Sequence, residues 1–422
     1  MIILAFILSG LSLLMSFLLI IRLKVTLLGL LLWSLKLFAG ALSPFWAVIG
    51  AVGALLGWVY GAFWAVPIGL LGAGIMIWYV IGLSRDHKGF ENAFGVGWKS
   101  LISPEQTGHM LKRRWTPILM KASPLPICEH NIPFWTIPGT ERELLCDIWS
   151  PPDGKASGLA FIYFHGSGWH IGDKDFGTRP LFNHLAAQGH TVMDVSYRLF
   201  PEVDMYDMIR DVKRAVAWMK TNASRYGVDP QKVVLGGGSA GAHLAILAAY
   251  TPDHAEFSAE ELIGADLSVR GVISFYGPTD LIAFYRQTGQ QRIKHQGDRY
   301  YPPLSMDPDA PKDMRNAGRL DKIFGGHPED VPEMYQLFST NSYIHTGCPP
   351  TLLVQGEHDR SVPVDATRTF YNQLVEAGVP AVNVVFPLTG HGFDLLLPQV
   401  NPAFQSALYD VDRFLALLVN KK

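Results

Sequence analysis

Residues 232–250 read KVVLGGGSAGAHLAILAAY, and this stretch decides the fold. A short valine-rich run ends in three glycines, and an apolar segment of helical length follows Ser239. The pattern predicts a buried strand at 232–236, a tight turn, and a helix from about Ala240 to Tyr250. The turn reads G-x-S-x-G, in which small residues beside the serine permit the sharp bend that presents its hydroxyl. We therefore interpret Ser239 as a nucleophile.

The same glycines allow a second interpretation. Gly236, Gly238 and Gly241 fit G-x-G-x-x-G, which binds a dinucleotide when an acidic residue ends the next strand about 20 positions later. Here the next apolar run begins only near residue 271, and it ends without an acidic residue. The nucleophile interpretation is favoured, and we expect no cofactor.

Strand and helix patterns alternate over residues 126–422 and predict an α/β fold. Further short apolar runs predict strands at 159–164, 191–197, 271–276, 350–355 and 382–386. Amphipathic or capped segments predict helices at 178–188, 205–219, 365–377 and 402–419. Alternation of this kind predicts a mostly parallel sheet covered by helices on both faces. Ligands bind at the carboxyl ends of such strands, so the turns after the strands are where functional residues are expected.

Two of these turns carry the partners that a serine nucleophile needs. The strand at 350–355 is followed by Glu357 and Asp359, and the last strand is followed by His391 between two glycines. A histidine takes the proton of the serine, and a carboxylate orients the histidine. We assign Asp359 to that carboxylate, with Glu357 as the neighbouring alternative. The chain order Ser, Asp, His is the order found in α/β-hydrolases.

The strand at 159–164 ends in His165-Gly-Ser-Gly-Trp169. A glycine-rich turn at this edge can aim backbone N–H groups at a developing oxyanion, together with the N–H after the nucleophile. We interpret His165 as a buried turn residue and not as a catalyst.

Apolar residues are concentrated in the first 83 positions, which hold three charged side chains. Candidate spans at 1–21, 25–41, 44–60 and 64–83 predict an integral membrane protein with three or four helices in the lipid bilayer. The pattern leaves open which side the rest of the chain occupies. The net charge of -2 gives no basis for nucleic acid binding. The three cysteines lack metal-binding spacing, so we expect no metal site.

Three further boundaries follow from composition. Residues 84–125 form a polar, partly basic connector beside the membrane, and residues 126–422 form the α/β domain. Residues 278–345 interrupt this domain between two strands and are expected to cap the pocket. We expect the α/β domain to bury a complete core without residues 1–83.

Residues 159–420 resemble the hormone-sensitive-lipase-like and acetyl-esterase (BD-FAE-like) branch of the α/β-hydrolases (α/β-hydrolase fold-3). The resemblance rests on His165-Gly-Ser-Gly-Trp169, Tyr197-Arg-Leu-Phe-Pro-Glu202, Gly237-Gly-Ser-Ala-Gly241 and the turns at Asp359 and His391. It implies an esterase or lipase with Ser239 as nucleophile, His391 as base and Asp359 as its partner. The sequence departs from the family at Ser167, where a glycine is usual, and at Gly238, where Asp or His is usual.

The resemblance also implies the remaining site residues. Backbone N–H groups of the oxyanion hole are expected from Gly166, Ser167, Gly168 and Ala240. Substrate contacts are expected from Trp169, Tyr276 and Phe393. The expected activity is hydrolysis of a lipophilic or lipid-linked acyl or acetyl ester through an acyl-enzyme. Acyl transfer by the same residues, and a non-catalytic receptor or membrane scaffold on this fold, are the alternatives.

Overall fold

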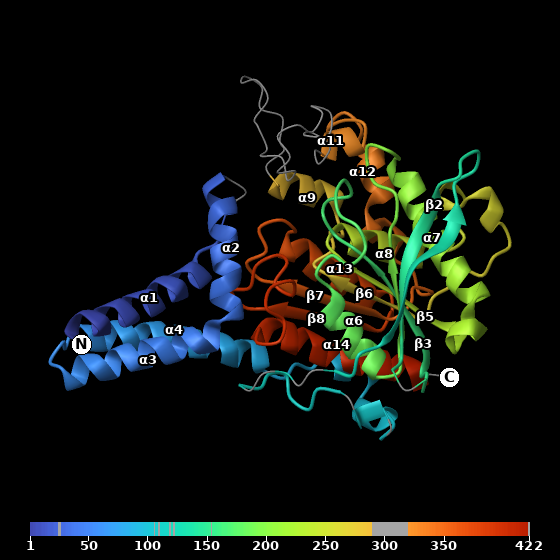
Figure 1. The fold of residues 1–422 in the computed structure, drawn as a ribbon. Helices are drawn as coiled ribbons and strands as arrows, with labels where there is room; N and C mark the ends of the chain where they lie inside the picture. The colour runs from blue at the N-terminus through green and yellow to red at the C-terminus, as the bar shows by residue number, and fades with distance from the viewer. Residues whose placement is uncertain are drawn as a thin grey trace.

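The computed structural model describes residues 1–420 except for 24–26, 105, 109, 118–119, 121–122, 153 and 289–319. A group of apolar helices at the N-terminus leads into a sheet that carries helices on both faces (Figure 1). The strands are β1 Ile127–Thr136, β2 Glu143–Ser150, β3 Gly158–Phe164, β4 Thr191–Val195, β5 Val228–Gly238, β6 Gly271–Phe275, β7 Thr351–Gly356 and β8 Ala381–Phe386. The helices are α1 Ile2–Ile20, α2 Leu27–Ala41, α3 Ser43–Val59, α4 Ala65–Ser84, α5 Gly89–Phe94, α6 Arg179–Ala187, α7 Met205–Thr221, α8 Ala240–Tyr250, α9 Leu281–Gln287, α11 Leu320–Ile323, α12 Pro332–Phe338, α13 Val364–Glu376 and α14 Pro402–Asn420.

The eight strands form one sheet in the order β1-β2-β4-β3-β5-β6-β7-β8. β1 and β2 pair antiparallel, and β2 also runs antiparallel to β4, whereas all pairs from β4 to β8 are parallel. The carboxyl ends of β3, β5, β7 and β8 therefore lie along one edge. This edge is where the sequence places its four functional turns.

Side chains along β3 alternate between two cores. Ala160, Ile162 and Phe164 belong to the core shared with α7, α8 and α13. Leu159, Phe161 and Tyr163 belong to the core shared with α6 and α14. Successive residues of a strand point to opposite faces, so a strand covered on both faces reads as a continuous apolar run.

The predicted mostly parallel α/β sheet is confirmed, and so are its six parallel strands. The predicted strand at 191–197 ends earlier, at Val195. The antiparallel pair β1 and β2 was not predicted. β1 is largely exposed at the edge of the sheet, so its sequence lacks the apolar run that marks the buried strands.

The N-terminal helices differ in whether they are long and apolar enough to span a bilayer. The described residues contain two helices long and apolar enough to cross a membrane, Ile2–Ile20 and Ala65–Phe94, the second comprising α4 and α5. The segments Leu32–Ala41 and Ser43–Val59 are bent by 80° at their junction, and they add a third if the pair is one span. Figure 1 shows α1, α3 and α4 side by side, with α2 standing against the α/β domain.

Small residues let α1, α3 and α4 approach closely. A Cβ on Gly50 of α3 would lie 2.7 Å from the carbonyl oxygen of Gly69 in α4 and 2.5 Å from Ser12 Oγ of α1. Such contacts between backbones are typical of helices that pack in lipid. The three helices therefore form one close-packed unit.

The connector at 84–125 lies along α14. Arg114 donates to both carboxylate oxygens of buried Asp410, at 2.7 and 2.6 Å. The N–H of Leu111 donates to Asp412 at 2.8 Å. These bonds tie residues 111–114 of the connector to the last helix of the α/β domain. The predicted insertion at 278–345 includes α9, α11 and α12. Its residues 289–319 lie outside the described residues.

Candidate active site

Ser239 lies in the turn between β5 and α8, as the sequence predicts. Its backbone has φ 51° and ψ -116°, a conformation that residues other than glycine rarely adopt. The turn is held because the N–H of Ser239 donates to Phe275 O at 2.8 Å. A Cβ at position 241 would collide with the backbone oxygens of Phe164 and His165, so only glycine fits at that position. Strand and helix thus force the serine hydroxyl to the sheet edge.

The structure brings His391 and Asp359 to this hydroxyl. His391 Nε2 lies 3.1 Å from Ser239 Oγ, and His391 Nδ1 lies 2.8 Å from Asp359 Oδ2. The Asp359 side chain is fully buried and that of His391 is 13% exposed. Ser239 and Asp359 are 152 and 32 positions from His391 in the chain, so the three meet only in the folded structure.

The Asp359 carboxylate is held in one orientation. Its Oδ1 accepts from the N–H groups of Ser361 and Val362, both at 2.8 Å. Its Oδ2 is then directed to His391 Nδ1, which must carry the proton of that bond. Nε2 of the neutral ring is consequently the free acceptor that faces the serine. The alternative carboxylate, Glu357, lies 4.0 Å from Arg22 instead.

A second buried carboxylate, that of Asp394, binds the tyrosine whose ring lies against the imidazole. The Tyr276 and His391 rings are 4.4 Å apart between centroids. The Tyr276 hydroxyl donates to Asp394 Oδ1 at 2.5 Å. Burial raises the pKa of Asp394, while the bond from Tyr276 opposes that rise. Asp394 was not among the predicted site residues, although it lies three positions after the histidine in the same turn.

The glycine turn after β3 lies against the serine. A Cβ on Gly166 would be 3.3 Å from Ser239 Cβ. Ser167 and Gly168 both have positive φ, at 88° and 67°. Among the described residues, no acceptor takes a hydrogen bond from the N–H groups of Gly166, Ser167, Gly168 or Ala240. These amides remain available to an oxyanion, and their role there stays a prediction.

His165 is buried in this turn, as expected for a structural residue. Its Nδ1 lies 2.9 Å from Gly166 O, and its ring stacks on Tyr197 at 4.6 Å. Burial lowers the pKa of His165, so the ring is neutral near pH 7.

The three predicted substrate residues are enclosed by protein. Trp169, Tyr276 and Phe393 are 1%, 4% and 2% exposed. The Trp169 ring meets His243 and two phenylalanines edge-on. Phe393 packs edge-on against Tyr276 and Phe386. These contacts support the turns of the site, and direct contact with substrate stays a prediction.

The described residues contain no group of three or more His, Cys, Asp or Glu side chains arranged to hold a metal ion. The chemistry available at this edge is that of a hydroxyl, an imidazole, a carboxylate and backbone amides.

This sheet order, with a strained serine turn after β5 and a histidine turn after β8, defines the α/β-hydrolase fold. The family model for BD-FAE matches residues 146–374. The chain belongs to the BD-FAE family.

Relatives and solved structures agree with this assignment. The probable carboxylic ester hydrolase LipM of Mycobacterium tuberculosis is 34% identical over 256 residues, which are 59% of this chain and 53% of LipM. Isoprenylcysteine alpha-carbonyl methylesterase ICME of Arabidopsis thaliana is 25% identical over 63% of this chain and 57% of its own length. The chain thus spans about half the length of the curated relatives it matches. Esterase 2 of Thermogutta terrifontis, phosphonylated by sarin, has a TM-score of 0.54 and 26% identity over 69% of this chain and 95% of that chain.

Proposed function

We propose that this protein is a membrane-anchored serine hydrolase that cleaves lipophilic or lipid-linked carboxylic esters. The observation that carries the proposal is the continuous hydrogen-bonded series from Ser239 Oγ through His391 to Asp359, with distances of 3.1 and 2.8 Å. A serine hydroxyl is a weak nucleophile until a neighbouring base removes its proton. The series supplies that base and the group that orients it.

The reaction proceeds through an acyl-enzyme. Ser239 Oγ attacks the ester carbonyl carbon while His391 Nε2 takes the hydroxyl proton. Amides of residues 166–168 and Ala240 receive the oxyanion of the tetrahedral intermediate. The imidazolium gives its proton to the leaving alcohol, and the acyl group remains on Ser239. Water then attacks this ester with His391 again as base, and the carboxylic acid leaves.

Asp359 acts in both halves of the reaction through His391. Its negative charge stabilises the imidazolium that forms each time a proton is taken. Because Asp359 Oδ1 accepts from two backbone N–H groups, the carboxylate cannot rotate, and its Oδ2 keeps the imidazole in one orientation. Asp359 therefore fixes the tautomer as well as the charge.

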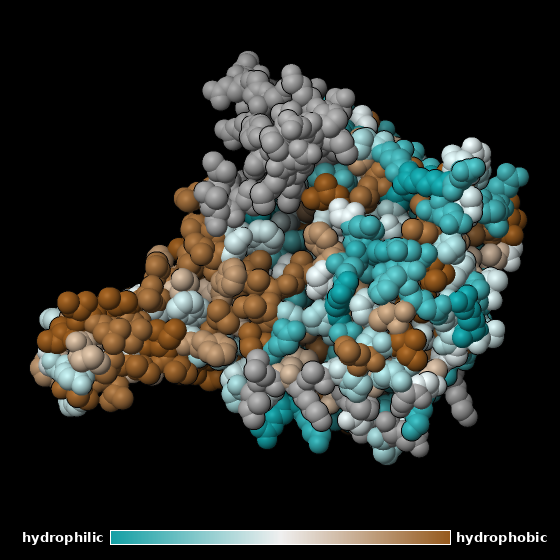
Figure 2. All heavy atoms as spheres, viewed as in Figure 1, coloured by the Kyte–Doolittle hydropathy of each residue, from teal (hydrophilic) through white to brown (hydrophobic). Residues whose placement is uncertain are grey.

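The proposed anchor is the unit of α1, α3 and α4. Figure 2 shows apolar residues covering this unit, whereas the α/β domain presents a mixed surface. The exposed large apolar side chains of α1, α3 and α4 include Leu14, Phe17, Leu55, Leu70 and Trp78. An exposed apolar surface of this extent is costly in water and is satisfied by lipid. Length and composition of α1 and of Ala65–Phe94 support the same conclusion.

A site held at a bilayer favours a substrate that resides there. ICME, one of the relatives, is named for a methyl ester of isoprenylcysteine, which joins an ester to an isoprenyl group. This supports an ester with a long apolar group as the substrate class of the present chain.

Labelling with a fluorophosphonate tests the hydrolase. Full-length protein in detergent micelles should be labelled on Ser239, and Ser239→Ala should lose the label together with about 10⁴-fold of its turnover. Ser342→Ala, at an exposed serine hydrogen-bonded to Gln336 O, is the matched control and should keep both. Labelling that survives Ser239→Ala would refute the assignment. In a series of p-nitrophenyl esters, a kcat/KM that rises with acyl length supports a lipophilic substrate. A maximum of kcat/KM at acetate would reject the lipophilic substrate and leave the serine hydrolase assignment standing.

A further inference from the structure

Polar side chains of the N-terminal helices contact the two turns that hold Asp359 and His391. Trp33 of α2 donates from Nε1 to His391 O at 3.1 Å. Lys36 of α2 lies 3.2 Å from His358 Nδ1, and Tyr79 of α4 lies 3.1 Å from Thr389 Oγ1. All three contacts join residues more than 300 positions apart in the chain. The helices therefore reach the catalytic edge itself.

Trp33 touches both turns at once. A Cβ on Gly392 would lie 3.5 Å from Cζ2 of the Trp33 ring, so the histidine turn rests on the indole. The guanidinium of Arg360 lies 4.9 Å from the ring centroid, in the range of a cation–π contact. One side chain thus spans the two turns whose residues 359 and 391 must stay in hydrogen-bond contact.

The Trp33 donor fixes a peptide group of the histidine turn. Among the described residues, Trp33 Nε1 is the hydrogen-bond donor to His391 O. That carbonyl belongs to the residue whose Nε2 must remain within reach of Ser239 Oγ. Rotation of the peptide between His391 and Gly392 would change the direction of the imidazole. The indole N–H opposes this rotation.

Lys36 and His358 form a second contact between α2 and the turn that holds Asp359. Lys36 Nζ lies 2.5 Å from Leu19 O and 2.7 Å from Ile21 O, at the end of α1. Lys36 Nζ also lies within hydrogen-bond distance of His358 Nδ1, and the tautomer of the ring sets which of the two donates. Burial lowers the pKa of His358 to about 4, assisted by the positive charges of Lys36 and Arg22, so the ring is neutral near pH 7. The N–H of His358 donates to Thr389 O at 2.9 Å and joins the two catalytic turns.

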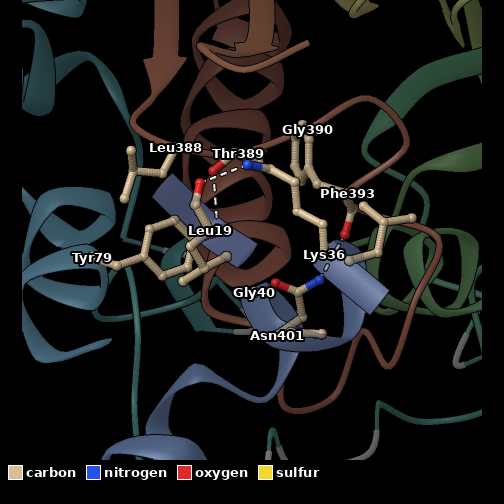
Figure 3. A pocket seen from close by; sticks show the side chains of 11 residues that line it. Leu19, Lys36, Gly40, Tyr79, Leu388, Thr389, Gly390, Phe393 and Asn401 are labelled. Atoms are coloured by element: carbon tan, nitrogen blue, oxygen red, sulfur yellow. Dashed lines mark hydrogen bonds between the residues drawn. The ribbon is translucent and has the colours of Figure 1, made fainter. Parts of the chain in front are cut away.

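The helices pack on the histidine turn with little space between them. Figure 3 shows the cavity at this contact, lined by Lys36, Tyr79, Thr389, Gly390 and Phe393 among others. Its volume is about 10 Å³, close to the smallest that holds one water molecule. The residues of α2 and of the histidine turn are therefore closely packed at this contact.

We propose that Trp33 is a positioning residue for His391, so that the N-terminal helices form part of the active site as well as an anchor. This inference rests on the proposed function, since it assigns Trp33 a role in that reaction. Trp33 touches no reacting atom and acts by holding the histidine turn. The expectation that the α/β domain buries a complete core without residues 1–83 stays a prediction, and the proposal adds that residues of the N-terminal helices align the histidine turn.

Trp33→Phe in the full-length protein tests this role, because it keeps an aromatic side chain at position 33 and removes the indole N–H. We expect kcat on p-nitrophenyl acetate to fall about 3- to 10-fold, the loss that one neutral hydrogen bond gives. KM should change less than about twofold, because the bond does not contact substrate. The rate of fluorophosphonate labelling should fall by the same factor as kcat. Trp58→Phe, the same change at a ring 67% exposed on α3, is the control and should be unaffected.

Folding is monitored by near-UV circular dichroism and by thermal unfolding of each variant. Unchanged kcat and labelling rate in folded Trp33→Phe overturn the proposal, as does an equal loss in Trp58→Phe. If Trp33→Phe does not fold, Tyr79→Phe decides, since it removes only the bond to Thr389: a fall of about twofold or more in kcat supports the proposal and no change refutes it. A wild-type protein that takes no label on Ser239 refutes the proposed function, and the role of Trp33 falls with it.

Discussion

Asp359→Asn replaces one carboxylate oxygen by an NH2 group at nearly constant size. In the structure, Oδ1 accepts from two N–H groups, those of Ser361 and Val362, whereas Oδ2 faces His391 Nδ1. The amide oxygen of asparagine must stay with the two N–H donors, because an NH2 group there would leave both unpaired. The new NH2 group then points at His391 Nδ1 and donates to it.

That reversal changes the tautomer of the histidine. His391 Nδ1 becomes an acceptor, so the ring carries its proton on Nε2, 3.1 Å from Ser239 Oγ. A protonated Nε2 cannot accept the serine proton, and the negative charge that stabilises the imidazolium is also gone. We expect kcat to fall about 10⁴-fold, or about 5 kcal/mol in the activation free energy, as in other serine triads.

The assay is p-nitrophenyl butyrate hydrolysis by the full-length protein in detergent, with active sites counted by fluorophosphonate titration. Asp365→Asn is the matched control, since this carboxylate pairs with Arg368 and is 87% exposed. It should keep wild-type kcat, and both variants should keep the wild-type thermal unfolding midpoint within a few degrees. A loss of less than about tenfold in folded Asp359→Asn would refute the orientation argued from the two N–H donors.

Two further predictions concern stability. Burial lowers the pKa of His243 to about 4 from its ordinary 6.5, against the opposing effect of its bond to Phe338 O, so the unfolded chain binds this proton first. The free energy of unfolding should therefore fall by up to about 3 kcal/mol as pH drops from about 6.5 to about 4, and urea titrations of His243→Gln should show a flatter profile. Gly241→Ala should cost about 3 kcal/mol or more because its methyl group meets the backbone oxygens of Phe164 and His165. Gly74→Ala in α4, where nothing lies within 4 Å, should leave the thermal midpoint nearly unchanged, and an equal effect in the two alanine variants would contradict the packing argument.

The sequence by itself determined the parallel sheet and the serine turn. Both depend on local physics: a strand buried on both faces must be apolar throughout, and a sharp strand-to-helix turn must have small residues beside Ser239. The helix Ala240–Tyr250 was predicted at its observed bounds for the same reason. β1 escaped prediction because an exposed edge strand makes no such local demand on its sequence.

Only the tertiary structure decided which side chains meet. Glu357 and Asp359 are two positions apart, and the sequence cannot say which of them faces His391; the amides of the turn direct Asp359 there, whereas Glu357 points towards Arg22. Trp33 gave no signal in the sequence, since a tryptophan in an apolar helix is equally typical of a membrane interface. Its bond to His391 joins positions 358 residues apart. Local patterns encode burial and backbone geometry, and contacts over such separations exist only once α2 has packed against the catalytic edge.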